Sequence, residues 1–99
     1  MPTRRVAIVG AALSDCGRVP DMTAMGLMAQ AARRAVADAG LTKDRIQGFG
    51  GHGTLLPPIE VSEYLGLRPT WVDATNVGGS SWEVMARHAV AAIANGEVD

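Results

Sequence analysis

The sequence of 99 residues contains little cysteine, few aromatic side chains, little charge and no long apolar run. Its one cysteine, Cys16, has no partner for an internal disulfide, so we expect a reducing, cytoplasmic compartment. No apolar stretch approaches the ~20 residues that a membrane-spanning helix requires. The net charge of -1 provides no electrostatic attraction to nucleic acid or to an anionic membrane. We therefore expect partners of neither kind.

The balance of charged and apolar residues points to a part of a larger body. Charged residues make up 19% of the chain and apolar residues 47%, whereas an average domain is about a quarter charged. A chain of this length buries only about 60–65% of its unfolded surface when it folds alone. The sequence therefore has more apolar surface than its few charged residues and small size can accommodate.

An apolar run over residues 6–12 follows Arg4 and Arg5 and resembles a short secretory signal, with a lipoprotein-like cleavage box before Cys16. However, Asp15 occupies a position where such a box needs a small residue, and the apolar run is minimal. Its β-branched residues and polar boundaries are typical of a strand buried on both faces. We therefore predict the first strand at residues 6–12.

The next stretch predicts a loop at residues 16–22 and then a capped helix. Thr23 is expected to cap it, because its hydroxyl can accept a hydrogen bond from a first-turn amide. The helix runs to about Ala39 and ends at Gly40, since glycine readily adopts the left-handed conformation there. Residues 41–45 predict a connector. One helix face collects apolar side chains that we interpret as core rather than as a cofactor site. They are Met25, Met28, Ala32, Ala35, Val36 and Ala39.

The middle of the chain is rich in glycine and proline. Residues 46–49 predict a short strand, and residues 48–53 predict a flexible turn. Two prolines at 57–58 are predicted to exclude a helix at their own positions, because proline lacks an amide and clashes with the preceding turn. A short helix is expected at residues 59–65, ending at Gly66.

The last third predicts a buried strand at residues 71–75, a turn at 78–80 and a helix at 81–95 that ends at Gly96. This helix is apolar around most of its circumference, which is typical of the interior of a protein. The residues are Trp82, Val84, Met85, Ala86, Ala89, Val90, Ala92 and Ile93. Because the other predicted elements are too few to surround it, we expect the chain to be truncated at Asp99. The alternation of strands and helices predicts an α/β fold with a parallel or mixed sheet and one buried helix.

Three stretches resemble the N-terminal portion of the thiolase superfamily. They are VAIVGAALSDCG from Val6, ADAGL ending at Leu41, and NVGGSSW from Asn76, which is followed by the apolar helix and by GEVD. Thiolases carry in the third stretch an asparagine, two residues, the nucleophilic cysteine, a small residue, serine and glycine. A buried helix ending in Gly-Glu-Ala-Asp comes next, and the spacing here holds without a gap.

The resemblance covers nearly the whole chain and implies an incomplete αβαβα layered fold. Residues 1–99 would form the front of the first of two similar halves, with no second domain present. In this register Gly79 occupies the position of the nucleophile, and glycine cannot attack a thioester. Cys16 aligns in the first loop, where thiolases commonly carry an aromatic residue, so it does not replace the missing thiol.

In lacking this cysteine, the sequence resembles the branch of the superfamily that contains sterol-carrier-type thiolases and lipid-transfer proteins. Some members of that branch lack the cysteine and act as retro-aldolases on acyl-CoA, often with a small OB-fold partner. The resemblance implies a retro-aldolase or an acyltransferase relative, with acyl-CoA as substrate, no cofactor and a homodimeric assembly. The 99 residues alone are expected to be inactive, because thiolases place further catalytic residues in the second half. The alternative is a non-catalytic thiolase-fold subunit that binds acyl-CoA or a partner.

The turn at residues 78–80 is the candidate site. A helix that starts there presents amides without intrahelical partners, and its dipole attracts negative charge such as a thioester enolate. We expect Asn76, Gly78 and Ser81 to contact the substrate, with Gly79 and Ser80 at the reacting position. The alternative is a tight turn in which Ser80 or Ser81 only caps first-turn amides. Ser80 as a nucleophile would need an activating base.

Two histidines and one glycine motif complete the candidates. His52 in the glycine-rich turn could act as a base near neutral pH, or could simply be a solvated loop histidine. His88 on the last helix is expected to make one structural hydrogen bond. No metal-ligand spacing is present. Glycines at 48, 50 and 53 match a dinucleotide fingerprint, but no helix is predicted to start there. A nucleotide-binding domain is thus the third and weakest hypothesis.

Overall fold

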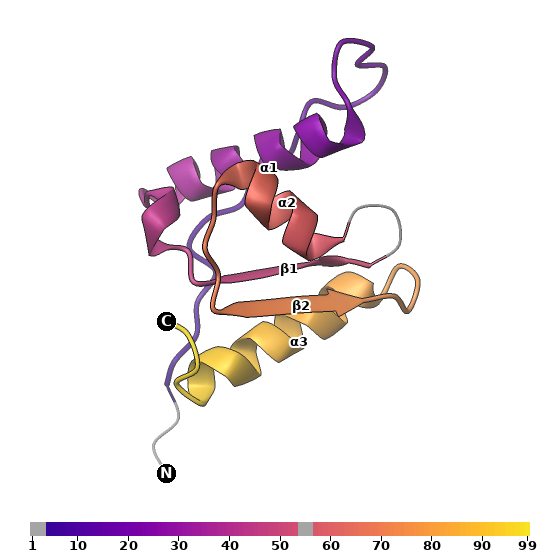
Figure 1. Ribbon diagram of the computed structural model, residues 1–99. Helices are drawn as coiled ribbons and strands as arrows, with labels where there is room; N and C mark the ends of the chain where they lie inside the picture. Colours follow the sequence, from indigo (N-terminus) through magenta and orange to yellow (C-terminus); the bar gives the residue numbers. More distant parts are fainter. Residues whose placement is uncertain (1–3, 54–56) are drawn as a thin grey trace.

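The computed structural model describes residues 4–53 and 57–99 and shows three layers (Figure 1). The elements follow the order α1 (Ala24–Asp38), a 3-10 turn (Lys43–Arg45), β1 (Gly48–His52), α2 (Pro58–Leu65), β2 (Trp71–Thr75) and α3 (Ser81–Ala94). The two strands pair in parallel, from Gly48 opposite Trp71 to His52 opposite Thr75. In Figure 1, α1 and α2 lie on one side of the strands and α3 on the other. The predicted α/β class with a parallel sheet is confirmed.

The N-terminal segment differs from its predicted form. Residues 6–12 were expected to form a buried strand, but they form no regular element, and Ile8 is 92% exposed. The segment is held against α1 instead: the amide of Ala11 donates to Asp38 Oδ2 at 3.0 Å. A Cβ at Gly10 would collide with the carbonyl of Ala35, so the main chain passes very close to the helix. A strand needs a neighbouring strand to satisfy its backbone amides. This segment lies against α1 instead and pairs with no strand of the described residues.

The loop before α1 is predicted correctly and is fastened to the helix by one carboxylate. Asp15 accepts from Arg34 Nη2 at 3.0 Å, and its own amide donates to Gln30 Oε1 at 2.7 Å. The hydrogen bond from Arg34, followed by that from Gln30, lowers the pKa of Asp15 below its ordinary value. Thr23 caps α1 as predicted, because its Oγ1 accepts from the amide of Gly26 at 2.9 Å. Gly40, just beyond the helix, has the expected left-handed conformation, with φ of +72°.

The glycine-rich stretch, predicted as a turn from residue 48, is a strand. Helices pack on both faces of β1. On the α3 side, a Cβ at Gly50 would lie at an ordinary contact distance, 3.5 Å, from the sulfur of Met85. A Cβ at Gly51 would lie 3.1 Å from Cγ of Pro58 on α2. Close helix packing on both sides therefore overrides the low strand propensity of glycine.

The double proline was predicted to exclude a helix at its positions, but α2 begins at Pro58. The prediction was wrong because a proline at the first helical position loses no hydrogen bond, and its fixed φ suits the helix. The predicted end at Gly66 is confirmed, with φ of +77°. β2 has the predicted bounds.

The core lies mainly between α1 and α2. Ala29, Val61 and Leu65 are buried there, and partly buried side chains pack around them. The predicted apolar face of α1 contributes to the partly buried side chains, which are Met25, Met28, Ala32, Phe49 and Leu67. The bounds predicted for α3 agree with the structure within one residue. However, this helix buries only its sheet-facing side, and Trp82 is 54% exposed. Within the described residues, two strands cover one side of the helix only.

None of the helices in the described ranges, 4–53 and 57–99, has the length and apolarity needed to cross a membrane.

Candidate functional site at the start of α3

The turn between β2 and α3 has a defined main-chain geometry. Gly78 has φ of +72°, a conformation that costs a side-chain-bearing residue extra energy. The amide of Ser81 donates to the Gly78 carbonyl at 3.1 Å. Val77 and Gly79 form an isolated bridge within the same turn. The predicted turn is therefore confirmed, with Gly78 as the residue that allows the chain to reverse into the helix.

Ser81 fastens this turn. Its side chain is completely buried, Oγ accepts from the amide of Val77 at 2.9 Å, and its hydroxyl donates to the carbonyl of Gly78 at 2.7 Å. A substrate contact by Ser81 stays a prediction and would have to compete with these bonds. The alternative was a tight turn in which Ser80 or Ser81 caps first-turn amides; the tight turn is present, but the predicted capping bonds are not. Ser80 makes no side-chain cap bond, and Ser81 bonds an amide that precedes the helix.

The first turn of α3 contains backbone amides without a hydrogen-bond acceptor. Within the described residues, the amides of Trp82 and Glu83 have no hydrogen-bond acceptor, whereas that of Val84 bonds the Ser80 carbonyl at 3.1 Å. Asn76, Gly78, Gly79 and Ser80 are all exposed, so the turn faces solvent. Unpaired amides at the positive end of a helix dipole favour a negatively charged group.

The ring of His52 lies near the first turn of α3. It ends β1 opposite Thr75 in the register, rather than lying in a glycine loop as predicted. Because side chains alternate along a strand, His52 shares the α3-facing side of β1 with Gly50, which contacts Met85. Its ring centroid lies 6.2 Å from that of Trp82, with the planes tilted by 41°. The structure thus brings His52 to the carboxyl ends of two parallel strands, where open α/β sheets commonly bind ligands.

Trp82 was predicted only as a core residue, yet it forms part of this site. The signal available in the sequence was its position, because it follows the glycine turn within the first turn of α3. A side chain there lies beside the open amides. No pattern in the sequence paired it with His52, which comes from another strand.

The other candidates lie elsewhere. His88 Nδ1 lies 2.7 Å from Asp73 Oδ2 on β2, so the predicted structural hydrogen bond is confirmed. Cys16 is an exposed free thiol in the loop before α1. Gly48 and Gly50 lie within β1 rather than in a turn between a strand and a helix, where the dinucleotide fingerprint would place them. Among the described residues, no group of three or more acidic, histidine or cysteine side chains could hold a metal ion.

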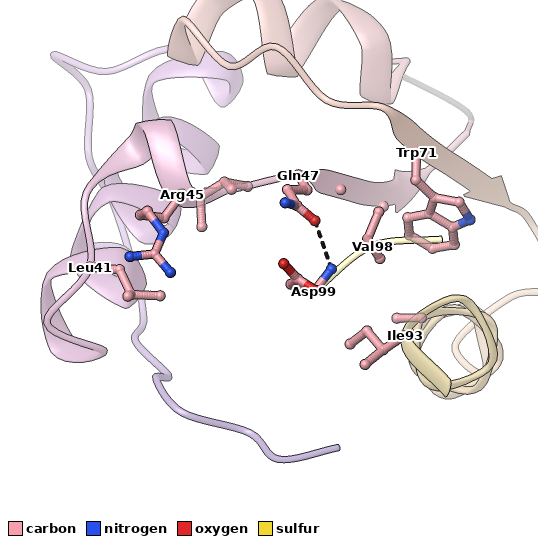
Figure 2. A pocket seen from close by; sticks show the side chains of 11 residues that line it. Leu41, Arg45, Gln47, Trp71, Ile93, Val98 and Asp99 are labelled. Atoms are coloured by element: carbon pink, nitrogen blue, oxygen red, sulfur yellow. Dashed lines mark hydrogen bonds between the residues drawn. The ribbon is translucent and has the colours of Figure 1, made fainter. Parts of the chain in front are cut away.

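Figure 2 shows a cavity of about 300 Å³ on the α3 side of the sheet. Trp71, Ile93 and Val98 line one part of it, and Arg45 extends toward it from the other side. The amide of Asp99 donates to Gln47 Oε1 at 2.6 Å across the cavity. Trp71 begins β2, whereas the candidate site follows the end of that strand. This cavity and the candidate site therefore lie at opposite ends of the sheet.

Comparison with known proteins gives a structural relative. Neither a family model nor a curated protein matches the sequence. The crystal structure of an SCP2-thiolase like protein type 1 from Mycobacterium smegmatis, described as monomeric, superimposes with a TM-score of 0.74 at 26% sequence identity. The match covers 93% of this chain and 21% of that one, so the chain spans about a fifth of the length of the relative. The predicted thiolase-like fold and the relationship to SCP2-thiolase-like proteins are confirmed.

Proposed function

We propose that this chain carries the oxyanion-binding part of a thiolase-like enzyme that acts on acyl-CoA thioesters without a cysteine nucleophile. The observation that carries the proposal is the ring contact between His52 and Trp82, a residue of the first turn of α3 whose own amide has no acceptor within the described residues. A base and a set of hydrogen-bond donors at one edge of a sheet are the two elements needed to form an enolate from a thioester.

The donors in this proposal are backbone groups. The amides of Trp82 and Glu83 have no acceptor within the described residues, and they would bond the thioester oxygen as it gains negative charge. Gly78 and Gly79 have no atoms within 4 Å of their open sides, so a substrate can approach the main chain closely. Asn76 and Ser81 flank this approach, Asn76 as an exposed polar residue and Ser81 as the residue that fixes the turn.

The proposed reaction is the retro-aldol cleavage of a β-hydroxyacyl-CoA. His52 takes the proton of the β-hydroxyl, the bond between the α and β carbons breaks, and a free aldehyde or ketone leaves. The electron pair of the broken bond becomes the thioester enolate, whose oxygen is held by the amides of α3. The α carbon then takes up a proton and gives the shortened acyl-CoA. No acyl-enzyme forms, which agrees with the presence of Gly79 at the nucleophile position of thiolases.

An acyltransferase relative is the neighbouring possibility within the same proposal. It would use Ser80 as the nucleophile, because Ser80 is exposed and makes no capping bond. Such a step requires a base within hydrogen-bond reach of the hydroxyl. A retro-aldolase needs no activated side-chain hydroxyl, and Gly79 at the position of the thiolase nucleophile therefore favours it.

The assembly is also proposed from the resemblance alone. We propose a cytoplasmic homodimer with a small OB-fold partner, and further catalytic groups outside residues 1–99. The relative from Mycobacterium smegmatis is described as monomeric, so sedimentation of this protein with and without the partner is the measurement that decides.

The test uses the product of the whole reading frame that contains these residues, alone and with its OB-fold partner. It is incubated with β-hydroxyacyl-CoA thioesters, and released carbonyl compound and shortened acyl-CoA are quantified together by mass spectrometry. Equal molar amounts of the two products support the proposal. Binding of acyl-CoA without turnover would instead identify the non-catalytic subunit. Turnover by residues 1–99 alone would contradict the expectation that further catalytic groups are required.

A further inference from the structure

A second cleft lies on the opposite face of the sheet. It has a volume of about 240 Å³ and is bounded by α1, α2 and the connector that contains the 3-10 turn. Its walls are apolar and consist of Ala32, Val36, Ile46, Phe49, Leu65 and Leu67. Because side chains alternate along β1, Phe49 points away from the α3 side that carries His52. The cleft is therefore separate from the proposed thioester site.

Two cationic side chains, Arg33 and Lys43, line the same cleft. Neither forms an ion pair within the described residues. Lys43 also lines an adjoining polar cavity of about 240 Å³ together with Arg68 and Asp44. Three cations and one carboxylate thus line the cleft and the cavity beside it. Asp44 is hydrogen-bonded by Thr42, which lowers its pKa and keeps it ionised.

The position of Lys43 has a structural cause as well. Its ammonium group packs over Gly66 at the carboxyl end of α2, where the helix dipole attracts a cation. This contact holds the exposed ammonium group beside the cleft. A carboxylate could accept hydrogen bonds there while an attached chain enters the apolar part.

We propose that this cleft binds a medium-chain fatty acid, with its tail between α1 and α2 and its carboxylate against Arg33 and Lys43. The apolar walls suit an alkyl tail, and the cationic rim suits an anionic head. The volume is below the usual range of about 300–1,000 Å³ for drug-sized ligands, which favours a single short chain over a bulky lipid. The proposal does not depend on the proposed enzyme activity.

The test is a calorimetric titration with octanoate, octanol and octyltrimethylammonium. Octanoate should bind, and the neutral and cationic probes should bind at least about fivefold more weakly, because each exposed ion pair contributes modestly. The double charge reversal Arg33→Glu with Lys43→Glu should lower octanoate affinity by about tenfold or more. Arg87→Glu, an exposed charge change on α3, is the matched control and should leave the affinity unchanged.

A second variant separates binding from folding. Val36→Phe should fill the cleft and abolish octanoate binding, whereas Val90→Phe on the exposed side of α3 should not. Thermal unfolding of each variant shows that it is folded. The proposal is overturned if octanoate does not bind, if all three probes bind equally, or if Val36→Phe binds normally. Concentration-dependent dimers that Val36→Phe disrupts would assign the cleft to a second copy and also overturn it.

Discussion

The two histidines on the α3 side of the sheet differ in what surrounds them. His88 lies in the middle of α3 beside Asp73 on β2, with 2.7 Å between Nδ1 and the carboxylate. His52 lies at the end of β1 against the ring of Trp82, beside a helix start with open amides. His88 thus lies beside a carboxylate and away from the start of α3, whereas His52 lies near that helix start. We therefore propose a structural role for His88 and a chemical role for His52.

The strongest test of this comparison replaces each histidine by asparagine. His52→Asn should lower the rate of acyl-CoA cleavage by about 100-fold or more, because a positioned general base contributes at least that much. His88→Asn should leave the rate within about twofold, since His88 lies outside the proposed site. Steady-state rates for both variants in the complete enzyme are the measurement. Equal losses in the two variants would remove the distinction between the two regions.

The turn itself can be broken at Ser81. Ser81→Ala removes both hydrogen bonds of a fully buried hydroxyl, to the amide of Val77 and to the carbonyl of Gly78, and the free energy of unfolding should fall by about 1–3 kcal/mol. Ser80→Ala is the matched control, because that exposed hydroxyl makes no capping bond, and it should change stability by less than about 0.5 kcal/mol. Urea unfolding of the two variants gives both numbers. If Ser80→Ala were the more harmful change, the described hydrogen bonding of the turn would be incorrect.

A smaller effect is expected at the glycines. Gly78→Ala forces a side chain into a left-handed conformation, and stability should fall by about 1 kcal/mol. Gly79→Ala meets no atom within 4 Å and has no positive φ, so stability should change by less than about 0.5 kcal/mol. Thermal unfolding monitored by circular dichroism measures both. Similar losses for the two alanines would show that backbone conformation is not what selects glycine at 78.

The smallest predicted effect lies away from the site, in the loop fastened to α1 by Asp15. Hydrogen bonding to Arg34 lowers the pKa of this carboxyl from 3.8, so its contribution to stability is complete above that value. The contribution is lost as the pH falls through the lower folded pKa. Hydrogen exchange of the Asp15 amide should therefore accelerate, relative to its intrinsic rate, only in strongly acidic solution. Asp15→Asn should show faster relative exchange already near neutral pH, and a wild-type profile in that variant would contradict the assignment.

Features that depend on residues close in sequence could be predicted, whereas features that depend on contacts between distant residues could not. Thr23, Gly40, Gly66 and Gly96 terminate helices through their own backbone and side-chain chemistry, so they could be identified without neighbours. The glycine-rich β1 was missed because Gly48 and Gly51 are selected by close contacts with Trp71 on β2 and Pro58 on α2, which no local pattern records.

The segment at residues 6–12 shows the converse. Its composition is typical of a buried strand, but a strand also requires a hydrogen-bonding neighbour, and the structure ties this segment to α1. The candidate turn was predictable from its glycines and serines, whereas the approach of His52 to Trp82 was not. That approach depends on the register between β1 and β2, in which His52 faces Thr75.

We propose that the start of α3 and His52 form one thioester-binding site. The decisive measurement is an NMR titration with a non-cleavable acyl-CoA analogue that follows both backbone amides and histidine rings. We expect the largest shifts at the amides of Trp82 and Glu83 and at the ring of His52, with His88 unchanged. Shifts confined to the cleft between α1 and α2, or equal at both histidines, would contradict it.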